Sequence, residues 1–203
     1  MQEAQSGLIP KFAENFFNAT VDYRINNFTY FDHSIIRPAI SKDDKKRMRT
    51  LSEKDFDDPI KRKTDAVLAV ISNCHAESGR LEYMRELDRF LNVTKVGGCF
   101  RNRRSSEEVE AMIKSHYFVV AFENVECAGY ATEKFWRLTK GIVPIVLRRR
   151  ILKGLAPPGS FVAADDYRSP RELARHLLAT IESREEYRKY GYHIPASHYF
   201  FHL

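Results

Sequence analysis

Short apolar runs alternate with segments of helical periodicity from residue 65 onward. The apolar runs are nearly continuous, as in strands buried on both faces of a sheet, and they occupy residues 65–72, 93–98, 117–124, 142–147 and 160–167. The segments between them have helical spacing or helix-start signals, and they occupy residues 79–92, 105–116, 132–141 and 169–182. Strict alternation of strand and helix predicts an α/β fold, a parallel sheet flanked by helices on both faces.

Two of the expected helices have a clear apolar stripe. In the first, the residues at helical spacing are Leu81, Met84, Leu87, Phe90 and Leu91. In the last, Ser169 is placed to cap the helix, Pro170 takes its first position, and the stripe is Leu173, Leu177, Leu178 and Ile181. These stripes predict the faces that each helix buries.

The first sixty residues follow a different pattern. Residues 16–38 are rich in aromatic residues and asparagine without a clear period, and residues 41–63 form a charged, mostly polar connector. We therefore divide the chain near Lys63, into residues 1–63 and one complete domain at residues 64–203. A chain of 203 residues, 43% of them apolar, is long enough to bury one sizeable core.

The formal charge of +6 says little about binding partners, because 27 acidic residues are interleaved with 33 basic ones. Basic residues cluster at 42–49, 61–63, 101–104 and 148–150. These clusters lack the aromatic and glycine pattern of an RNA-binding sheet, and we interpret them as solvated surface. A nucleic-acid-binding module is the disfavoured alternative, and salt-dependent RNA binding would be its signature.

No apolar run reaches the roughly 20 residues needed to cross a bilayer, and the first residues lack the apolar core of a signal peptide. The chain as written therefore reads as soluble. Three Asn-x-Ser/Thr sequons, at Asn18, Asn27 and Asn92, favour passage through the secretory pathway.

Neither the cysteines nor the histidines predict a metal site. Cys74, Cys99 and Cys127 are too few and too far apart for a zinc cage. Either Cys74 and Cys99 form a disulfide, with Cys127 left over, or the cysteines are buried free thiols. His75 and His116 are scattered, and we expect them to be loop or core residues.

In an open parallel sheet, ligands bind beyond the carboxyl ends of the strands. The end of the third apolar run and the loop after it carry Asn124, Tyr130, Thr132, Glu133 and Lys134. Thr132 is placed to cap a helix, and Lys134 in its first turn opposes the helix dipole unless a phosphate neutralises it. Glu133 suits ribose hydroxyls, Tyr130 a flat base and Asn124 a ring edge. The alternative to a nucleotide site is ordinary capping beside a half-buried tyrosine and a snorkelling lysine.

Arg80 opens the helix after the first strand. Its guanidinium could bind a diphosphate, or it could pair with Glu77 or Glu82. The sequence has no Gly-x-Gly-x-x-Gly motif and no Walker loop, which disfavours dinucleotide-binding and P-loop proteins.

Several blocks of the sequence together resemble a known family. They are FFNATVDYR (16–24), VISNCHAESGRLEYMREL (70–87), AFENVECAGYATEKFW (121–136), GIVPIVL (141–147), PPGSFVAADDYRSPRELA (157–174) and YRKYGYH (187–193). In this order and spacing they resemble the donor-binding half of the alpha-1,3-fucosyltransferases. One departure is Arg148 and its two arginine neighbours, where relatives commonly carry a glycine after the VP strand.

The resemblance implies a GT-B glycosyltransferase with two Rossmann-like domains and GDP-fucose in the cleft between them. This chain would hold mainly the C-terminal donor domain, with a remnant of the acceptor domain. The implied reaction is inverting transfer of L-fucose from GDP-beta-L-fucose to a GlcNAc hydroxyl of a glycoprotein or glycolipid glycan. By position, Arg80 and Lys134 would hold the diphosphate, Glu133 the ribose hydroxyls, and Asn124 and Tyr130 would frame the nucleoside.

The resemblance further implies that the reaction requires no metal or other cofactor, and that stimulation of the reaction by a divalent cation is possible. Its general base is a carboxylate of the N-terminal acceptor domain, which we expect to be almost wholly absent from this chain. The anchor that holds the full-length form in the Golgi membrane, facing the lumen, is expected to be absent as well. A GDP-binding or glycan-binding remnant without turnover is the alternative function. The acceptor, a Lewis-type antenna or the chitobiose core of an N-glycan, stays open.

Overall fold

The computed structural model describes residues 60–127, 130–136, 142–153, 156 and 159–191, together with the backbone of two short strands, β1 (Phe31–Asp32) and β2 (Ile35–Ile36). β1 and β2 pair antiparallel. The predicted remnant at 1–63 falls almost wholly outside the described residues, as do the sequons at Asn18 and Asn27. The third sequon residue, Asn92, is described and exposed.

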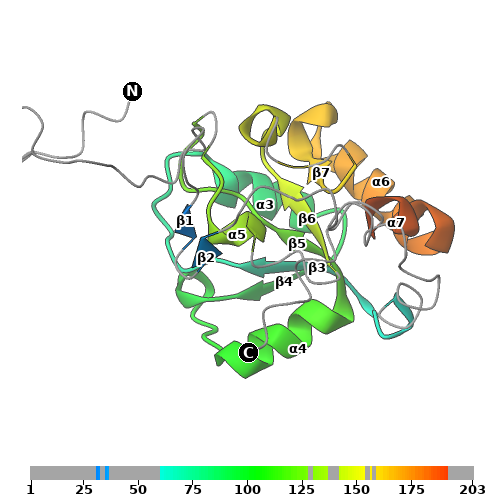
Figure 1. The fold of residues 1–203 in the computed structure, drawn as a ribbon, viewed down its shortest axis with the longest axis horizontal. Coiled ribbons are helices and arrows are strands. Elements are labelled where there is room, and N and C mark those ends of the chain that lie inside the picture. The colour runs from blue at the N-terminus through cyan, green and yellow to red at the C-terminus, as the bar shows by residue number, and fades with distance from the viewer. Residues whose placement is uncertain are drawn as a thin grey trace, which may run out of the picture.

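Five parallel strands form the main sheet of the described residues. In chain order they are β3 (Asp65–Val70), β4 (Val93–Val96), β5 (His116–Val120), β6 (Val143–Val146) and β7 (Val162–Ala163). Across the sheet the order is β4-β3-β5-β6-β7, and every neighbouring pair is parallel (Figure 1). The chain steps outward from β3 to β4 and then crosses back to β5, so the order reverses between β3 and β5. The predicted parallel sheet is confirmed.

Helices cover both faces of this sheet, as predicted. α3 (Arg80–Asp88) and α6 (Pro170–Glu182) pack on one face, where Val67, Phe118 and Ile145 join their core. α4 (Ser106–Ser115) packs on the other face against Leu68 and Val119. Figure 1 shows α4 below the sheet and α6 on its opposite side. Alternate residues of β3 and β5 therefore serve opposite cores, which is why β3 is apolar after Asp65 and β5 is apolar or aromatic after His116.

Shorter elements complete the described part. They are three 3-10 turns, η1 (Gly98–Phe100), η2 (Arg149–Leu152) and η3 (Ala164–Asp166), and two further helices, α5 (Glu133–Trp136) and α7 (Arg184–Gly191). α7 was not expected from the sequence. The helix is anchored by Tyr187, which is 5% exposed and donates its hydroxyl to the carbonyl of Tyr117 at 2.7 Å.

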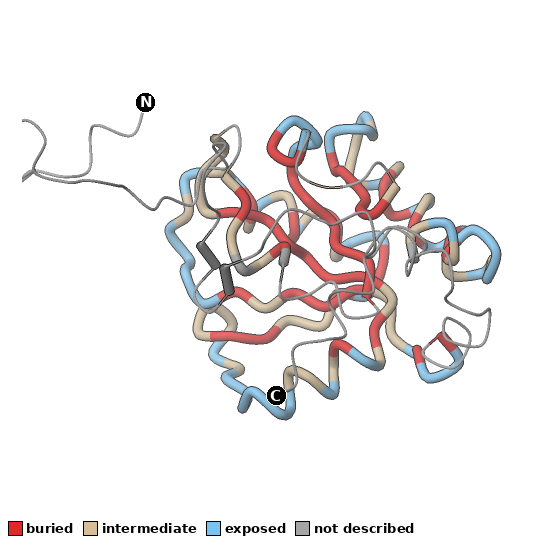
Figure 2. The backbone as a smooth tube through the Cα atoms, in the orientation of Figure 1, coloured by how far each residue is buried: buried red, intermediate tan, exposed pale blue. Residues whose placement is uncertain are grey.

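Most positions in the five strands of the main sheet are buried (Figure 2). The predicted stripes are correct at their centres, since Met84, Leu87, Leu173 and Leu177 are all fully buried. Two predicted core residues are wrong at the margins: Phe90 is 39% exposed and Leu178 is 41% exposed. In α6, Ala174 and Thr180 are buried together with Leu173 and Leu177, whereas Leu178 is not. The ring of Phe90 lies beyond the end of α3, and the guanidinium carbon of Arg171 is 5.7 Å from its centroid.

Lys63 contradicts the interpretation of residues 61–63 as solvated surface. Its side chain is buried, and its Nζ donates to the carbonyl oxygen of His116 at 2.7 Å. His116 is itself a buried core residue, as expected, with Nε2 2.8 Å from the hydroxyl of Thr94. His75 is exposed in the loop after β3. The start of the domain is therefore fastened to the sheet through a buried ammonium group.

Burial of Lys63 predicts a pH-dependent stability. Desolvation lowers the pKa of Lys63 from 10.5 to about 8. Between these values the unfolded chain keeps a proton that the folded chain has released, so the free energy of unfolding rises with pH. We expect a gain of about 2 kcal/mol from pH 8 to about pH 10, measured by urea denaturation. The variant Lys63→Met should flatten this rise, and an equal rise in the variant would contradict the assignment to Lys63.

Candidate functional site

Two loops meet where the strand order reverses. The loop after β3 leads through Asn73 and Ser78 to α3, and the loop after β5 begins at Ala121. Ser78 joins them twice: its N–H donates to the carbonyl of Asn124 at 3.1 Å, and its hydroxyl donates to the carbonyl of Glu123 at 2.7 Å. The two neighbouring strand ends thus carry a connected polar surface at the edge where such sheets bind ligands.

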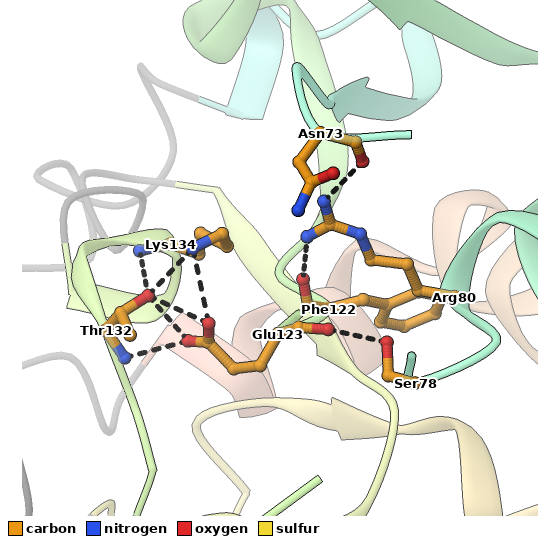
Figure 3. A network of polar contacts seen from close by, with 7 residues as sticks. All are labelled: Asn73, Ser78, Arg80, Phe122, Glu123, Thr132 and Lys134. Atoms are coloured by element: carbon orange, nitrogen blue, oxygen red, sulfur yellow. Dashed lines mark hydrogen bonds and ion pairs between the residues drawn. The ribbon is translucent and has the colours of Figure 1, made fainter. Parts of the chain in front are cut away.

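Arg80 is the central connection between these loops. Its side chain extends from the first turn of α3, where Gly79 takes a left-handed conformation at φ 68°. Nη1 donates to the carbonyl of Phe122 at 3.0 Å and Nη2 to the carbonyl of Asn73 at 2.8 Å (Figure 3). The residue is only 2% exposed, and Nε has no hydrogen-bond partner among the described residues. The structure therefore shows Arg80 bonded to neither Glu77 nor Glu82.

Burial also sets the electrostatics of Arg80. Desolvation lowers the pKa of the guanidinium, while the negative charge of Glu123 acts in the opposite direction. Tyr130 is also near enough to raise the pKa of the guanidinium, as Glu123 does. Arg80, Glu123 and Tyr130 therefore share one electrostatic environment, although they are up to 50 residues apart in the sequence.

Glu123 organises the segment that contains Thr132 and Lys134. The carboxylate is 5% exposed, and its Oε1 accepts from the backbone N–H of Thr132 at 2.8 Å. The hydroxyl of Thr132 donates to the same carboxylate at 2.8 and 2.9 Å. The Nζ of Lys134 lies 3.3 Å from Oε2 and donates to the hydroxyl of Thr132 at 3.1 Å (Figure 3). Thr132 also accepts from the N–H of Lys134 at 3.4 Å, in the capping position directly before α5.

Sequence reasoning did not place Glu123 among the site residues. The signal was present, because a carboxylate directly after a continuous apolar run has to find partners when the run is buried. The run itself obscured it, since residues 117–124 were predicted as one strand. β5 ends at Val120 instead, and the buried Ala121 and Phe122 belong to the loop that leads to Glu123.

The other predicted site residues lie at the same edge. Asn124 has a buried side-chain oxygen, Oδ1, without a hydrogen-bond partner among the described residues. Tyr130 is half-buried, and its N–H donates to the carbonyl of Cys127 at 3.1 Å. Of Glu133 only the backbone is described, so its predicted contact with ribose stays a prediction. The predicted roles of Arg80, Asn124, Tyr130 and Lys134 also stay predictions, although the structure brings these residues to one edge.

A small hollow lies beside Glu123. It is mostly apolar, and its lining consists of Ala121, Glu123, Ala131, Phe135, Val146, Leu147, Ile151 and Leu152. Apolar surroundings of this kind strengthen electrostatic interactions with the carboxylate, because they exclude water.

Three consecutive arginines follow β6 at the same end of the sheet. Arg148 and Arg150 both donate to the carboxylate of Glu126, at 3.0 and 3.2 Å. Arg149 pairs with Asp166. All three arginines are exposed, as predicted for this basic cluster. Their acidic partners tie the loop after β6 to the loops after β5 and β7.

The cysteines are free thiols in the structure, with Cys74 exposed and Cys99 and Cys127 half-buried. Burial and the interaction with the neighbouring Cys74 thiol raise the pKa of Cys99. The described residues contain no group of three or more His, Cys, Asp or Glu side chains placed to hold a metal ion. In the described part of the chain, every helix is too short or too polar to span a membrane.

The fold and the site define a doubly wound α/β domain whose polar residues gather at the reversal of strand order, as in domains that bind nucleotides at this edge. Residues 60–193 match the C-terminal part of glycosyltransferase family 10, the fucosyltransferases. The chain therefore belongs to this family, and the predicted resemblance is confirmed.

Similar proteins agree with this placement. Glycoprotein 3-alpha-L-fucosyltransferase A of Drosophila melanogaster is 36% identical over 136 residues, which cover 63% of this chain and 27% of that protein. Alpha-(1,3)-fucosyltransferase 7 of Bos taurus is 35% identical over 136 residues, covering 65% and 39%. A crystal structure of alpha1,3-fucosyltransferase with GDP-fucose is similar in fold, with a TM-score of 0.57 at 24% identity, covering 74% of this chain and 45% of that one. The chain thus spans less than half the length of these relatives.

Proposed function

We propose that this chain provides the donor-binding half of an alpha-1,3-fucosyltransferase. It binds GDP-beta-L-fucose, and the complete protein transfers L-fucose with inversion to a GlcNAc hydroxyl of a glycan. The observation that carries the proposal is the position of Lys134, held with Glu123 at the edge that also presents Arg80, Asn124 and Tyr130. A related fold solved with GDP-fucose supports the choice of donor.

The chemistry of this reaction suits the charges at the edge. Fucose leaves the diphosphate as negative charge grows on the departing oxygen, and nearby cations stabilise that charge in the transition state. Lys134 supplies one such cation, and Arg80 supplies a second, buried one. Glu133 would hold the ribose hydroxyls, with Asn124 and Tyr130 beside the nucleoside. Transfer needs neither a resident metal nor another cofactor on this account, and stimulation by a divalent cation would act on the diphosphate.

The acceptor hydroxyl must also lose a proton, which requires a general base. We assign this role to a carboxylate of the family's N-terminal domain, and we place the full-length protein in the Golgi membrane with its catalytic part in the lumen. The exposed sequon residue Asn92 is compatible with that compartment. The second candidate function is that of a remnant that binds GDP or glycan without turnover. It is kept because no residue in the described part of the chain is assigned as the general base.

Calorimetric titration tests the donor site directly. The chain is titrated with GDP and GDP-fucose, with ADP and UDP as controls. Selective binding of the guanine nucleotides is expected. Equal binding of all four nucleotides, or no binding, would overturn the proposal. Fucose transfer to a GlcNAc-terminated acceptor then separates the enzyme from the remnant.

The variant Lys134→Ala should bind GDP at least tenfold more weakly than the unmodified chain. The substitution removes a charge-assisted contact to the diphosphate, worth about 1.5 to 3 kcal/mol. Titration with GDP measures the change. Lys189→Ala is the matched control, because Lys189 is an exposed lysine on α7 that also pairs with a glutamate, Glu186. Equal affinities of the two variants would remove Lys134 from the site.

A further inference from the structure

We propose that Glu123 is the positioning residue of the donor site: it fixes Thr132 and Lys134 so that the ammonium group is in place before the diphosphate arrives. The inference rests on the proposed function for the identity of the ligand. The contacts by which Glu123 holds residues 132–134 lie within the chain and do not depend on the identity of the ligand.

The first support is the burial of Glu123. A carboxylate that is 5% exposed is costly unless donors compensate for the water it has lost. The donors it has are the N–H and hydroxyl of Thr132 and the Nζ of Lys134. Since all three come from residues 132–134, the compensation of one buried charge also fixes the conformation of that segment.

The second support is that Glu123 is fastened at its other end. Its carbonyl oxygen accepts from the hydroxyl of Ser78, in the loop after β3. The preceding carbonyl, of Phe122, accepts from Arg80. Glu123 therefore connects the segment of Lys134 to the loop and helix that carry Arg80, and it sets the two cationic groups relative to each other.

The third support concerns the lysine. A lysine side chain has several rotatable bonds, and holding it in one place costs rotamer entropy. Lys134 is partly exposed, with 26% of its side chain accessible, yet its Nζ is held by both Oε2 of Glu123 and the hydroxyl of Thr132. The entropy is therefore lost on folding, and a diphosphate that binds meets an ordered cation.

A double-mutant cycle tests whether Glu123 acts through Lys134. Glu123→Gln keeps the size of the side chain and an oxygen for Thr132, but it removes the charge that holds Nζ. We expect about fivefold to tenfold weaker GDP binding in Glu123→Gln, and a change of less than about twofold when the same substitution is made in Lys134→Ala. Guanosine, which has no phosphate, should bind the chain and the Glu123→Gln variant equally. Glu86→Gln, which loses an exposed ion pair with Arg89 on α3, is the matched control.

Other outcomes contradict the proposal. Tighter GDP binding by Glu123→Gln would mean that the carboxylate only competes with phosphate for Lys134. Equal losses in both backgrounds, or a parallel loss of guanosine binding, would mean a structural role alone.

Hydrogen exchange keeps the inference testable if the unmodified chain fails to bind GDP, which would overturn the proposed function. In Glu123→Ala the amide of Thr132 loses its acceptor, so its exchange should accelerate at least tenfold relative to amides of β5. Unchanged exchange of that amide would show that Glu123 does not hold the segment, whatever the ligand is.

Discussion

Replacing Gly97 with alanine is expected to lower the free energy of unfolding by more than about 3 kcal/mol. Gly97 directly follows β4, with φ 115° and ψ 177°, a conformation that is open essentially to glycine alone. A Cβ atom built on this backbone would lie 2.3 Å from the carbonyl oxygen of Ile71 and 2.7 Å from its carbonyl carbon. Both are backbone atoms, so no side-chain rotation can relieve the overlap.

The overlap would act on the sheet where it supports the site. The carbonyl of Ile71 accepts from the N–H of Cys99, and the N–H of Ile71 donates to the carbonyl of Val96. An alanine at Gly97 would push β4 away from the end of β3 and strain the loop that leads to Arg80.

Urea denaturation of the Gly97→Ala and Gly98→Ala variants compares their free energies of unfolding. At Gly98 a Cβ would meet nothing nearer than 3.5 Å, and its φ lies outside the left-handed region. Gly98→Ala should therefore change stability by less than about 1 kcal/mol. Similar losses in the two variants would show that the close approach to Ile71 does not limit the residue at position 97.

The fold was predictable because its main signal is local. Apolar runs and helical stripes identify strands and helices, and strict alternation of the two leaves the parallel sheet as the arrangement. The ends of the elements were less predictable. The run 93–98 includes Gly97, which leaves the strand because of its backbone conformation, and a pattern of apolar residues does not contain that information.

Buried polar groups account for most of the differences between the structure and the predictions made from the sequence. Lys63 belongs to a basic cluster, and its burial depends on the carbonyl of His116, 53 residues away in the sequence. Glu123 depends on Thr132 and Lys134 in the same way. Such partners are assembled by the tertiary fold, so the sequence shows the unusual residue without showing what compensates for it. α7 had a local signal, since Ser183 accepts from the N–H of Glu186 at 3.3 Å, the spacing of a capping pair.

The residues of the candidate site were predictable as a group, and their interactions were not. The family motif places Arg80, Asn124, Tyr130 and Lys134 together, and the structure does bring them to one edge. The sequence assigned Arg80 to a ligand, however, whereas the structure adds a role within the protein, because its guanidinium bonds two backbone carbonyls from different loops.

Arg80→Ala should therefore affect both folding and binding. The substitution leaves the carbonyls of Phe122 and Asn73 without their donor, and each buried group left unpaired costs about 1 to 3 kcal/mol. The variant also no longer bears the cost of desolvating the guanidinium, which offsets part of this loss. We expect the free energy of unfolding to fall by about 2 to 4 kcal/mol, and GDP affinity to fall more than tenfold.

Two measurements on the same variants separate these effects. Urea denaturation gives the loss of stability, and titration with GDP at a temperature where the variant is folded gives the loss of affinity. Arg89→Ala, at the exposed far end of α3, should change stability by less than about 0.5 kcal/mol and leave GDP binding unchanged. A stable Arg80→Ala variant that binds GDP normally would show that the two loops keep their positions without the buried guanidinium. A destabilised variant with normal affinity would confine Arg80 to the role of holding the loops, leaving Lys134 as the cation that meets the diphosphate.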